Sequence, residues 1–187
     1  FVVLALASGL VAAGDAPATH RSQIRIRDPF VLPVAAEQAY YVYGTTTAGI
    51  FDGGIEGKAV MAFRTVDLDH WEDPVAVWEV PADHWGRETV WAPEVHRYRG
   101  RYYLFVTLTS TEALPTPEGR PRNVRRGTEI LVADSPLGPF RPRGRGPQTP
   151  PDWMALDGSL WVAHAVPSMV FCPEWVQTTD GSFDVLR

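Results

Sequence analysis

The sequence predicts an all-β fold made of repeated antiparallel sheets, and three observations carry this prediction. Short apolar or alternating runs bounded by turn residues occur along most of the chain, while the periodicity of amphipathic helices is nearly absent. Pro and Gly number 17 and 16 among the 187 residues, which suits short strands joined by turns. A pair of strands also recurs three times at a regular interval.

Each repeat begins with a predicted hairpin. The second strands of the three hairpins are "AYYVYGT" at 39–45, "RYYLFVT" at 101–107 and "PSMVFCP" at 167–173. They follow "RDPFVLPV", "WAPEVHRY" and "LDGSLWVA", each after a short turn. A third strand recurs as well, in "AVMAFRTVDLDHWEDP" and "EILVADSPLGPFRP". Equivalent positions of the hairpins lie 62 and 66 residues apart, which gives a unit of three or four strands.

A unit of this length is typical of a β-propeller blade. One blade cannot bury both faces of its sheet, so blades stack around a common axis. We predict blade 1 at about 24–75, blade 2 at about 88–145 and an incomplete blade 3 at about 153–187. Because propellers contain about 4 to 8 blades, we expect residues 19–187 to be the N-terminal part of a longer domain. A two-sheet sandwich needs no further blades but leaves the repeat unexplained.

Residues 1–18, "FVVLALASGLVAAGDAPA", form an apolar run followed by small residues. This pattern is typical of the core and cleavage zone of a secretory signal, and it is too short for a membrane span. We interpret it as a partial signal peptide; a buried N-terminal strand or helix is the alternative. The single Cys172 excludes an internal disulfide. We predict an exported protein, periplasmic or extracellular, that is monomeric and has no membrane contact after signal removal.

Composition argues against several function classes. The net charge is −5, and the densest basic stretch, "GRPRNVRRG" at 119–127, has the composition of a solvated loop, so we expect no nucleic-acid partner. One Cys and five scattered His show no zinc-site spacing. No glycine-rich nucleotide loop follows a strand and leads into a helix. We therefore predict no cofactor.

Acidic residues recur at the starts of the predicted innermost strands. These starts contain Asp28 in "RDPF", Trp91 and Glu94 in "WAPEV", and Asp157 in "ALDGSLW". In a propeller, such starts converge on one pocket at the axis. Two or three carboxylates beside a Trp are typical of a glycosidase site. Hydrolysis of an acetal needs one carboxylic acid that protonates the leaving oxygen and one carboxylate that acts on the other face. Asp-Pro and Asp-Gly are also common turn dipeptides, but their equivalent placement favours the site.

The motifs "RDPF", "YYVYGTTT", "WAPEVHRYRGRYYLFVTLT", "SPLGPFRP" and "ALDGSLWV" followed by "PSMVFCPEWVQ" resemble glycoside hydrolase family 43 over about residues 24–180. The resemblance implies a five-bladed β-propeller, of which this chain covers about the first three blades as the N-terminal part of a catalytic domain. It also implies inverting hydrolysis of arabinofuranosyl or xylosyl linkages in plant polysaccharide. Asp28 would then be the general base, and Asp157 would tune the pKa and orientation of the general acid.

The general acid itself is less well defined. In most of the family it is a Glu that opens the fourth blade, which this chain does not reach. Within the chain, Glu174 in "CPEWVQ" is the candidate, with a substrate contact as the alternative role. Trp175, Trp91, Glu94 and Arg27 complete the expected substrate contacts.

Some family members also hold a structural calcium ion in the central channel through a His of a late blade, which is not in this chain. Two other functions stay open. One is a non-catalytic carbohydrate-binding propeller, and the other is a related propeller glycoside phosphorylase.

Overall fold

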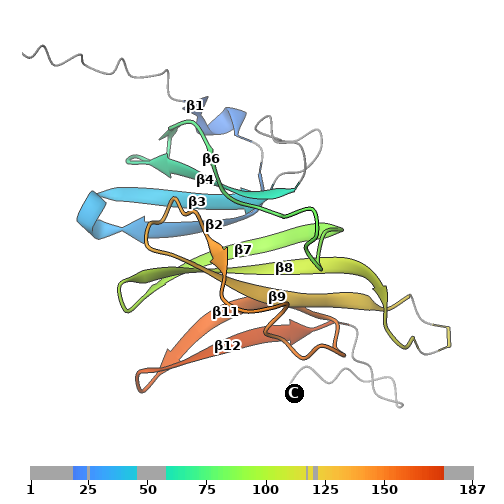
Figure 1. Cartoon of the computed structure of the whole chain (residues 1–187). Coiled ribbons are helices and arrows are strands. Elements are labelled where there is room, and N and C mark those ends of the chain that lie inside the picture. Colours follow the sequence, from blue (N-terminus) through green and yellow to red (C-terminus); the bar gives the residue numbers. More distant parts are fainter. Residues whose placement is uncertain (1–18, 25, 46–57, 117, 120–121, 175–187) are drawn as a thin grey trace, which may run out of the picture.

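The computed structural model describes residues 19–24, 26–45, 58–116, 118–119 and 122–174. In these ranges the regular structure is β-strand apart from two 3-10 turns, η1 (Arg21–Gln23) and η2 (Ala35–Glu37). The strands form three antiparallel sheets, which lie one above another (Figure 1) and are called blades 1, 2 and 3 below. The predicted all-β fold with repeated sheets is therefore confirmed. No helix of the described residues is long and apolar enough to cross a membrane.

Blade 1 has the strand order β1-β5-β4-β3-β2, and β6 also pairs with β4. Its strands are β1 (Thr19–His20), β2 (Arg27–Val34), β3 (Ala39–Thr45), β4 (Ala59–Thr65), β5 (His70–Trp71) and β6 (Val75–Glu79). Both β1 and β6 extend beyond the predicted range of 24–75. A strand of two residues such as β1 is too short to show an alternating pattern, which explains why the sequence did not reveal it.

Blade 2 has the order β10-β9-β8-β7, and blade 3 consists of β11 and β12 within the described residues. The strands are β7 (Thr89–Tyr98), β8 (Arg101–Ala113), β9 (Val124–Ala133), β10 (Arg141–Pro142), β11 (Ala155–Ala163) and β12 (Val166–Pro173). Two-residue turns join the hairpins, with φ of 47° and 82° at Arg99 and Gly100, and 50° and 63° at His164 and Ala165. Positive φ at both turn residues matches the right-handed twist of the strands.

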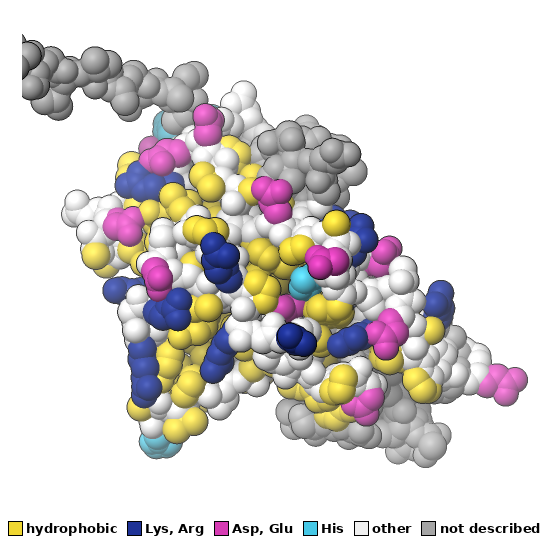
Figure 2. Space-filling view, viewed as in Figure 1, with side chains coloured by type: hydrophobic (Ala, Val, Ile, Leu, Met, Phe, Trp, Pro, Cys, Tyr) yellow, Lys and Arg dark blue, Asp and Glu magenta, His cyan; other side chains and the backbone are white. Residues whose placement is uncertain are grey.

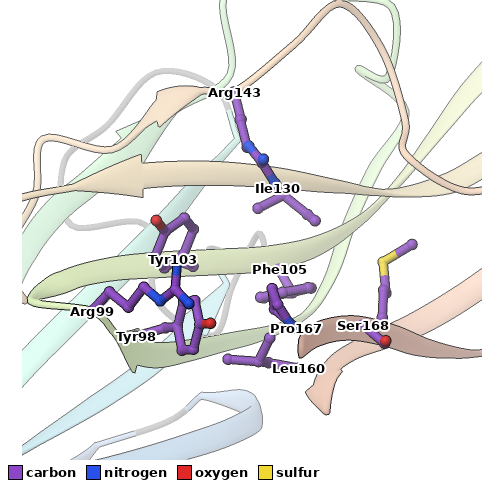
Figure 3. A pocket seen from close by; sticks show the side chains of 10 residues that line it. Tyr98, Arg99, Tyr103, Phe105, Ile130, Arg143, Leu160, Pro167 and Ser168 are labelled. Carbon is purple, nitrogen blue, oxygen red and sulfur yellow. The ribbon is translucent and has the colours of Figure 1, made fainter. Parts of the chain in front are cut away.

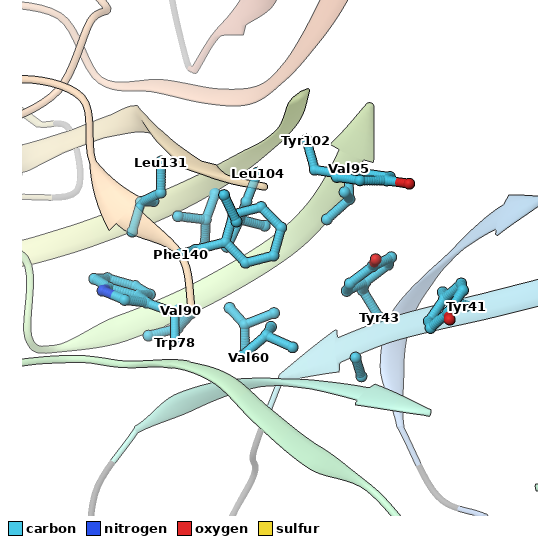
Figure 4. Close-up of a cluster of buried hydrophobic side chains, with 14 of the residues drawn as sticks. Tyr41, Tyr43, Val60, Trp78, Val90, Val95, Tyr102, Leu104, Leu131 and Phe140 are labelled. Carbon is cyan, nitrogen blue, oxygen red and sulfur yellow. The ribbon is translucent and has the colours of Figure 1, made fainter. Parts of the chain in front are cut away.

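The main hydrophobic core lies between blades 1 and 2. Figure 4 shows the tyrosine and aliphatic side chains of blade 1 opposite those of blade 2, among them Tyr43, Val60, Val95, Leu104 and Leu131. Each of these five side chains is 0% exposed. Burial of one such side chain contributes about 1.5–3 kcal/mol, so this interface fixes the two sheets against each other.

One buried carboxylate interrupts this core. Glu129 is 1% exposed, and its Oε2 accepts a hydrogen bond from Trp85 Nε1 at 2.7 Å. His84 Nε2 lies 3.2 Å from the same oxygen. A charge buried without partners would cost several kcal/mol, so these two contacts explain how the core tolerates Glu129.

The other face of blade 2 lies against blade 3 and is more polar. Because side chains alternate along a strand, Thr89, Thr107, Thr109 and Thr128 share this face with Arg126. Thr107 and Thr128 are both 0% exposed. This polar face carries the contacts of the candidate site described below.

The outer faces of blades 1 and 3 expose apolar residues. Val31 on β2 is 46% exposed, and Trp161, Val166 and Val170 of blade 3 are 61%, 61% and 57% exposed. In a complete propeller, neighbouring blades cover such faces. The view in Figure 2 shows apolar side chains between charged side chains of both signs.

A cavity of about 350 Å³ lies between blades 2 and 3 (Figure 3). Its lining includes Tyr98, Tyr103, Leu160 and Pro167. Tyr98 ends β7, whereas Trp91 stands near the start of that strand. The cavity therefore lies toward the opposite end of β7 from Trp91.

Candidate active site

Each innermost strand has a β-bulge near its start. The pairing register shifts at 27–30 in β2, at 91–94 in β7 and at 156–159 in β11. In each bulge one non-glycine residue has a positive φ: Asp28 at 49°, Ala92 at 43° and Asp157 at 54°. Asp adopts this left-handed conformation more readily than most residues because its short side chain can hydrogen-bond locally.

The bulges define which residues are equivalent between blades. Asp28, Ala92 and Asp157 occupy the same bulge position, followed by Pro29, Pro93 and Gly158. The equivalence that the sequence indicated for Asp28 and Asp157 is thus present in the structure, and Ala92 takes this position in blade 2. Glu94 lies two residues after Ala92. The sequence did not reveal this offset, because the extra residue of a β-bulge is not visible as a change in the sequence pattern.

Two buried threonines of blade 2 hold the Asp157 bulge. Thr107 Oγ1 accepts a hydrogen bond from the Asp157 N–H at 2.9 Å, and Thr128 Oγ1 accepts one from the Gly158 N–H at 3.0 Å. A Cβ on Gly158 would lie 2.5 Å from Thr128 Cγ2. Only glycine allows this close approach of the two blades. The Asp-Gly dipeptide therefore fixes Asp157 at an interface between blades as well as forming a bend.

Carboxylates from three blades act on Asp157. The pKa of Asp157 is raised by partial desolvation and then by the negative charges of Asp28, Glu94 and Glu174. The residue as a whole is exposed, so its burial is incomplete and the neighbouring charges are a substantial cause. The structure thus brings together the four acidic residues predicted for the site.

Glu94 belongs to a hydrogen-bonded group with His96. Its Oε2 lies 2.9 Å from His96 Nε2. Hydrogen bonds from His96 first, and also from Ser159, lower the pKa of Glu94 despite its partial burial. The His96 ring packs against Phe30 and Phe105, with ring centres 5.2 and 5.5 Å apart. Glu94 is therefore held as a carboxylate, and His96 is a site neighbour that the sequence did not reveal.

Arg126 connects Trp91 with Glu174. Its guanidinium carbon lies 4.6 Å from the centre of the Trp91 ring, and its Nε donates to Thr109 Oγ1 at 2.8 Å. Its Nη1 forms an ion pair with Glu174 Oε2, and the Glu174 N–H donates to the Met154 carbonyl at 2.6 Å. The side chains of Arg126 and Glu174 are only 11% and 15% exposed.

The interpretation of 119–127 as a solvated loop is therefore wrong at its C-terminal end. Residues from Val124 onward form β9, and Arg126 points into the candidate site. The Pro and Gly residues of this stretch are typical of a loop, and they obscured the strand pattern that begins at Val124. The alternation of Arg126 and Thr128 on one face of a strand was the available signal.

The remaining predicted residues lie at the edge of the site or outside the described part of the chain. Arg27 is exposed at the start of β2, next to Asp28. Trp175 and the proposed signal segment, 1–18, are outside the described residues. Among the described residues, no group of three or more His, Cys, Asp or Glu is arranged to hold a metal ion.

Comparisons with known proteins concern the family and the fold of this chain. The family model described as glycosyl hydrolases family 43 matches residues 22–180. The extracellular endo-α-(1→5)-L-arabinanase 1 of Bacillus subtilis (strain 168) is 24% identical over 120 residues, which are 59% of this chain and 34% of that protein.

Two solved structures from Bacteroides thetaiotaomicron VPI-5482 are similar. An endo-arabinase has 35% identity and a TM-score of 0.67, over 86% of this chain and 50% of its own. An endo-1,4-β-xylanase has 23% identity and a TM-score of 0.60, over 87% of this chain and 47% of its own, which shows the fold alone.

The chain spans half or less of the length of these relatives. The three blades are thus about the first three of a five-bladed propeller. The family match over nearly the whole described chain shows that this chain belongs to glycosyl hydrolases family 43.

Proposed function

We propose that the protein containing this chain is an inverting glycoside hydrolase that cleaves arabinofuranosyl or xylosyl linkages of plant polysaccharide. The observation that carries the proposal is the placement of Asp28 and Asp157 at equivalent bulges of two blades. The negative charge of Asp28 contributes to the raised pKa of Asp157, so the two carboxyls lie within electrostatic range, and we propose that they face one substrate cleft. The similarity to an endo-arabinase supports the substrate class.

Asp28 is suited to the role of general base. It lies exposed on its bulge, where its carboxylate can take a proton from a water molecule that attacks the anomeric carbon. In inverting hydrolysis, base and acid lie on opposite sides of the sugar, about 6.5–9.5 Å apart, with room for this water. Pro29 follows the bulge and has no N–H that would need a partner.

Asp157 is suited to a modulating role. Its backbone is fixed by Thr107 and Thr128, and the negative charges of three other acids act on its carboxyl. A negative charge close to a carboxylic acid disfavours ionisation of that acid. Asp157 therefore helps to keep a neighbouring general acid protonated. This acid is either Glu174 or a carboxyl of the part of the propeller that this chain does not span.

The substrate contacts follow from the same cleft. Trp91 and Glu94 of β7, together with Arg27 and Trp175, are the proposed substrate contacts. The name of the Bacillus relative includes the word extracellular. Together with the signal-like segment at 1–18, this supports export of the protein.

Assays of the full-length protein test this function. We expect release of reducing sugar from arabinan or xylan oligosaccharides without added phosphate, and NMR of the first product should show the inverted anomer. Dependence on phosphate would instead indicate a phosphorylase. Binding of these oligosaccharides without hydrolysis would indicate a carbohydrate-binding propeller. A retained anomeric configuration would contradict the proposed base, because retention requires a carboxylate nucleophile.

A further inference from the structure

We propose that Arg126 is a positioning residue of the substrate cleft. Its guanidinium fixes the Trp91 indole as a sugar-binding surface and commits Glu174 to an ion pair, so that Glu174 supports this surface and is not the proton donor. The inference rests on the proposed function, because it concerns the same cleft. It assigns roles to Arg126 and Glu174 in that cleft.

The contact with Trp91 is a cation–π interaction. The guanidinium carbon lies 4.6 Å from the ring centre, within the limit of about 6 Å for such contacts. The guanidinium covers one face of the indole, and Trp91 keeps partial exposure. An indole held on one face presents its remaining surface to ligand in a fixed orientation. The apolar C–H groups of a pentose ring fit such a surface.

The guanidinium is itself held on two further sides. Its Nε donates to Thr109 Oγ1 at 2.8 Å, and Thr89 Oγ1 donates to the same oxygen at 2.6 Å. Its Nη1 contacts Glu174. Arginine has a planar fork of donors that can make these contacts while one face lies on a ring, and lysine does not. The low exposure of both charged partners means that loss of one leaves the other poorly solvated.

Glu174 is fixed from its backbone as well. Its N–H donates to the Met154 carbonyl, and Arg126 forms a parallel bridge with Met154. Blade 2 and the two ends of the blade 3 hairpin are therefore tied together at Arg126. A general acid must carry a proton toward the glycosidic oxygen and regain it in every turnover. A proton on the Glu174 oxygen that accepts from Arg126 would disrupt the ion pair, which argues for the positioning role.

The preceding residue provides a matched control. The Arg125 guanidinium carbon lies 5.1 Å from the Trp85 ring centre, and Arg125 Nη1 pairs with Glu112 at 3.0 Å. Arg125 thus repeats the combination of a Trp ring and a Glu partner. Because side chains alternate along β9, it points to the opposite face of the sheet from Arg126. A substitution there perturbs a similar cluster without touching the cleft.

The test compares Arg126→Met, Arg126→Lys and Glu174→Gln with Arg125→Met in the full-length protein. The substrates are an oligosaccharide and its nitrophenyl glycoside, whose leaving group needs no protonation. We expect each of the three cleft variants to raise KM about 10-fold and to change kcat less. The ratio of the variant's kcat to the wild-type kcat should be the same on both substrates. The double variant Arg126→Met/Glu174→Gln should have a KM no higher than that of either single variant, because each single substitution already breaks the same ion pair.

Arg125→Met should leave both kinetic constants unchanged, whatever it does to Tm. A KM that Arg126→Met leaves unchanged would overturn the inference. So would a Glu174→Gln variant whose kcat falls about 10²-fold or more on the oligosaccharide and recovers on the nitrophenyl glycoside, because this is the behaviour of a general acid. That result would leave the proposed function intact. If the wild-type protein hydrolyses nothing, the proposed function fails, and oligosaccharide Kd values for the same variants still test Arg126.

Discussion

The two faces of blade 2 differ in composition although they belong to the same strands. The face toward blade 1 contributes Val95, Leu104 and Leu131 to a dry core. The face toward blade 3 places Thr107 and Thr128 against the Asp157 bulge. On the first face, burial of apolar area holds the sheets together. On the second, a few directed hydrogen bonds hold one carboxyl in place, so stability and positioning are separated between the faces.

This separation predicts that substitutions on the two faces affect different measurements. Changes on the blade 1 face should lower stability and leave the kinetic constants of folded molecules unchanged. Changes on the blade 3 face should also alter the kinetic constants of the folded molecules.

The largest change in stability is expected for Leu104→Ala. Leu104 is 0% exposed within the core between blades 1 and 2. Leu→Ala changes in such cores lower the free energy of unfolding by about 2–5 kcal/mol. Denaturant unfolding of the full-length protein measures this loss and gives the folded fraction under assay conditions, from which kcat per folded molecule follows. A reduced kcat in the folded fraction would contradict the separation.

Gly158→Ala should have a large effect on activity. The new Cβ would lie 2.5 Å from Thr128 Cγ2, so the Asp157 bulge must move away from blade 2. Overpacking of this kind costs about 1–3 kcal/mol. A shift of about 1 Å at a catalytic carboxyl can reduce kcat about 10²-fold. Steady-state kinetics beside a Tm measurement checks this, and a variant with normal kcat would show that the close approach does not position Asp157.

A smaller effect is expected for Thr107→Val. Valine has nearly the same shape, but it leaves the Asp157 N–H without its acceptor, at a cost of about 1–3 kcal/mol. We expect kcat to fall about 10-fold as the bulge loosens. Thr65→Val in blade 1 is the control, because Thr65 is equally buried and donates to the His70 carbonyl at 2.7 Å. If both variants lose activity equally, position on the blade 3 face has no special importance.

The smallest effect concerns the stability of Asp157→Asn as a function of pH. Because the folded-state pKa of Asp157 is raised, the free energy of unfolding falls as pH rises from the ordinary Asp pKa through this raised pKa, and the loss is complete above it. The Asn variant should therefore have a slightly higher Tm than the wild type at neutral pH. The difference should vanish toward acidic pH, where wild-type Asp157 is protonated in both states. A lower Tm at neutral pH would show that the neighbouring charges do not oppose its ionisation.

The hairpins and the repeat could be predicted because their patterns are local. The equivalent placement of Asp28 and Asp157 could be predicted because the repeat aligns the strands that they open, whereas the Pro or Gly beside each of them indicates only a turn. The position of Glu94 could not, because the bulge shifts its register relative to the aspartates. Thr107 and Thr128 gave no signal, since a buried Thr in a strand looks like ordinary β-propensity. Arg126 was hidden in a basic stretch rich in Pro and Gly, where the alternation with Thr128 was a weak signal, and the pairing of β8 with β9 sets it opposite Thr109.

We propose above that Asp28 acts as the general base. The direct test of this role is the hydrolytic rate of Asp28→Asn in the full-length protein, with Asp134→Asn as control. Asp134 is 87% exposed and pairs with Arg101 at 2.8 Å, outside the cleft. We predict that Asp28→Asn folds normally and loses about 10²–10⁴-fold of kcat, while Asp134→Asn keeps the wild-type rate. A wild-type rate in Asp28→Asn would contradict the account.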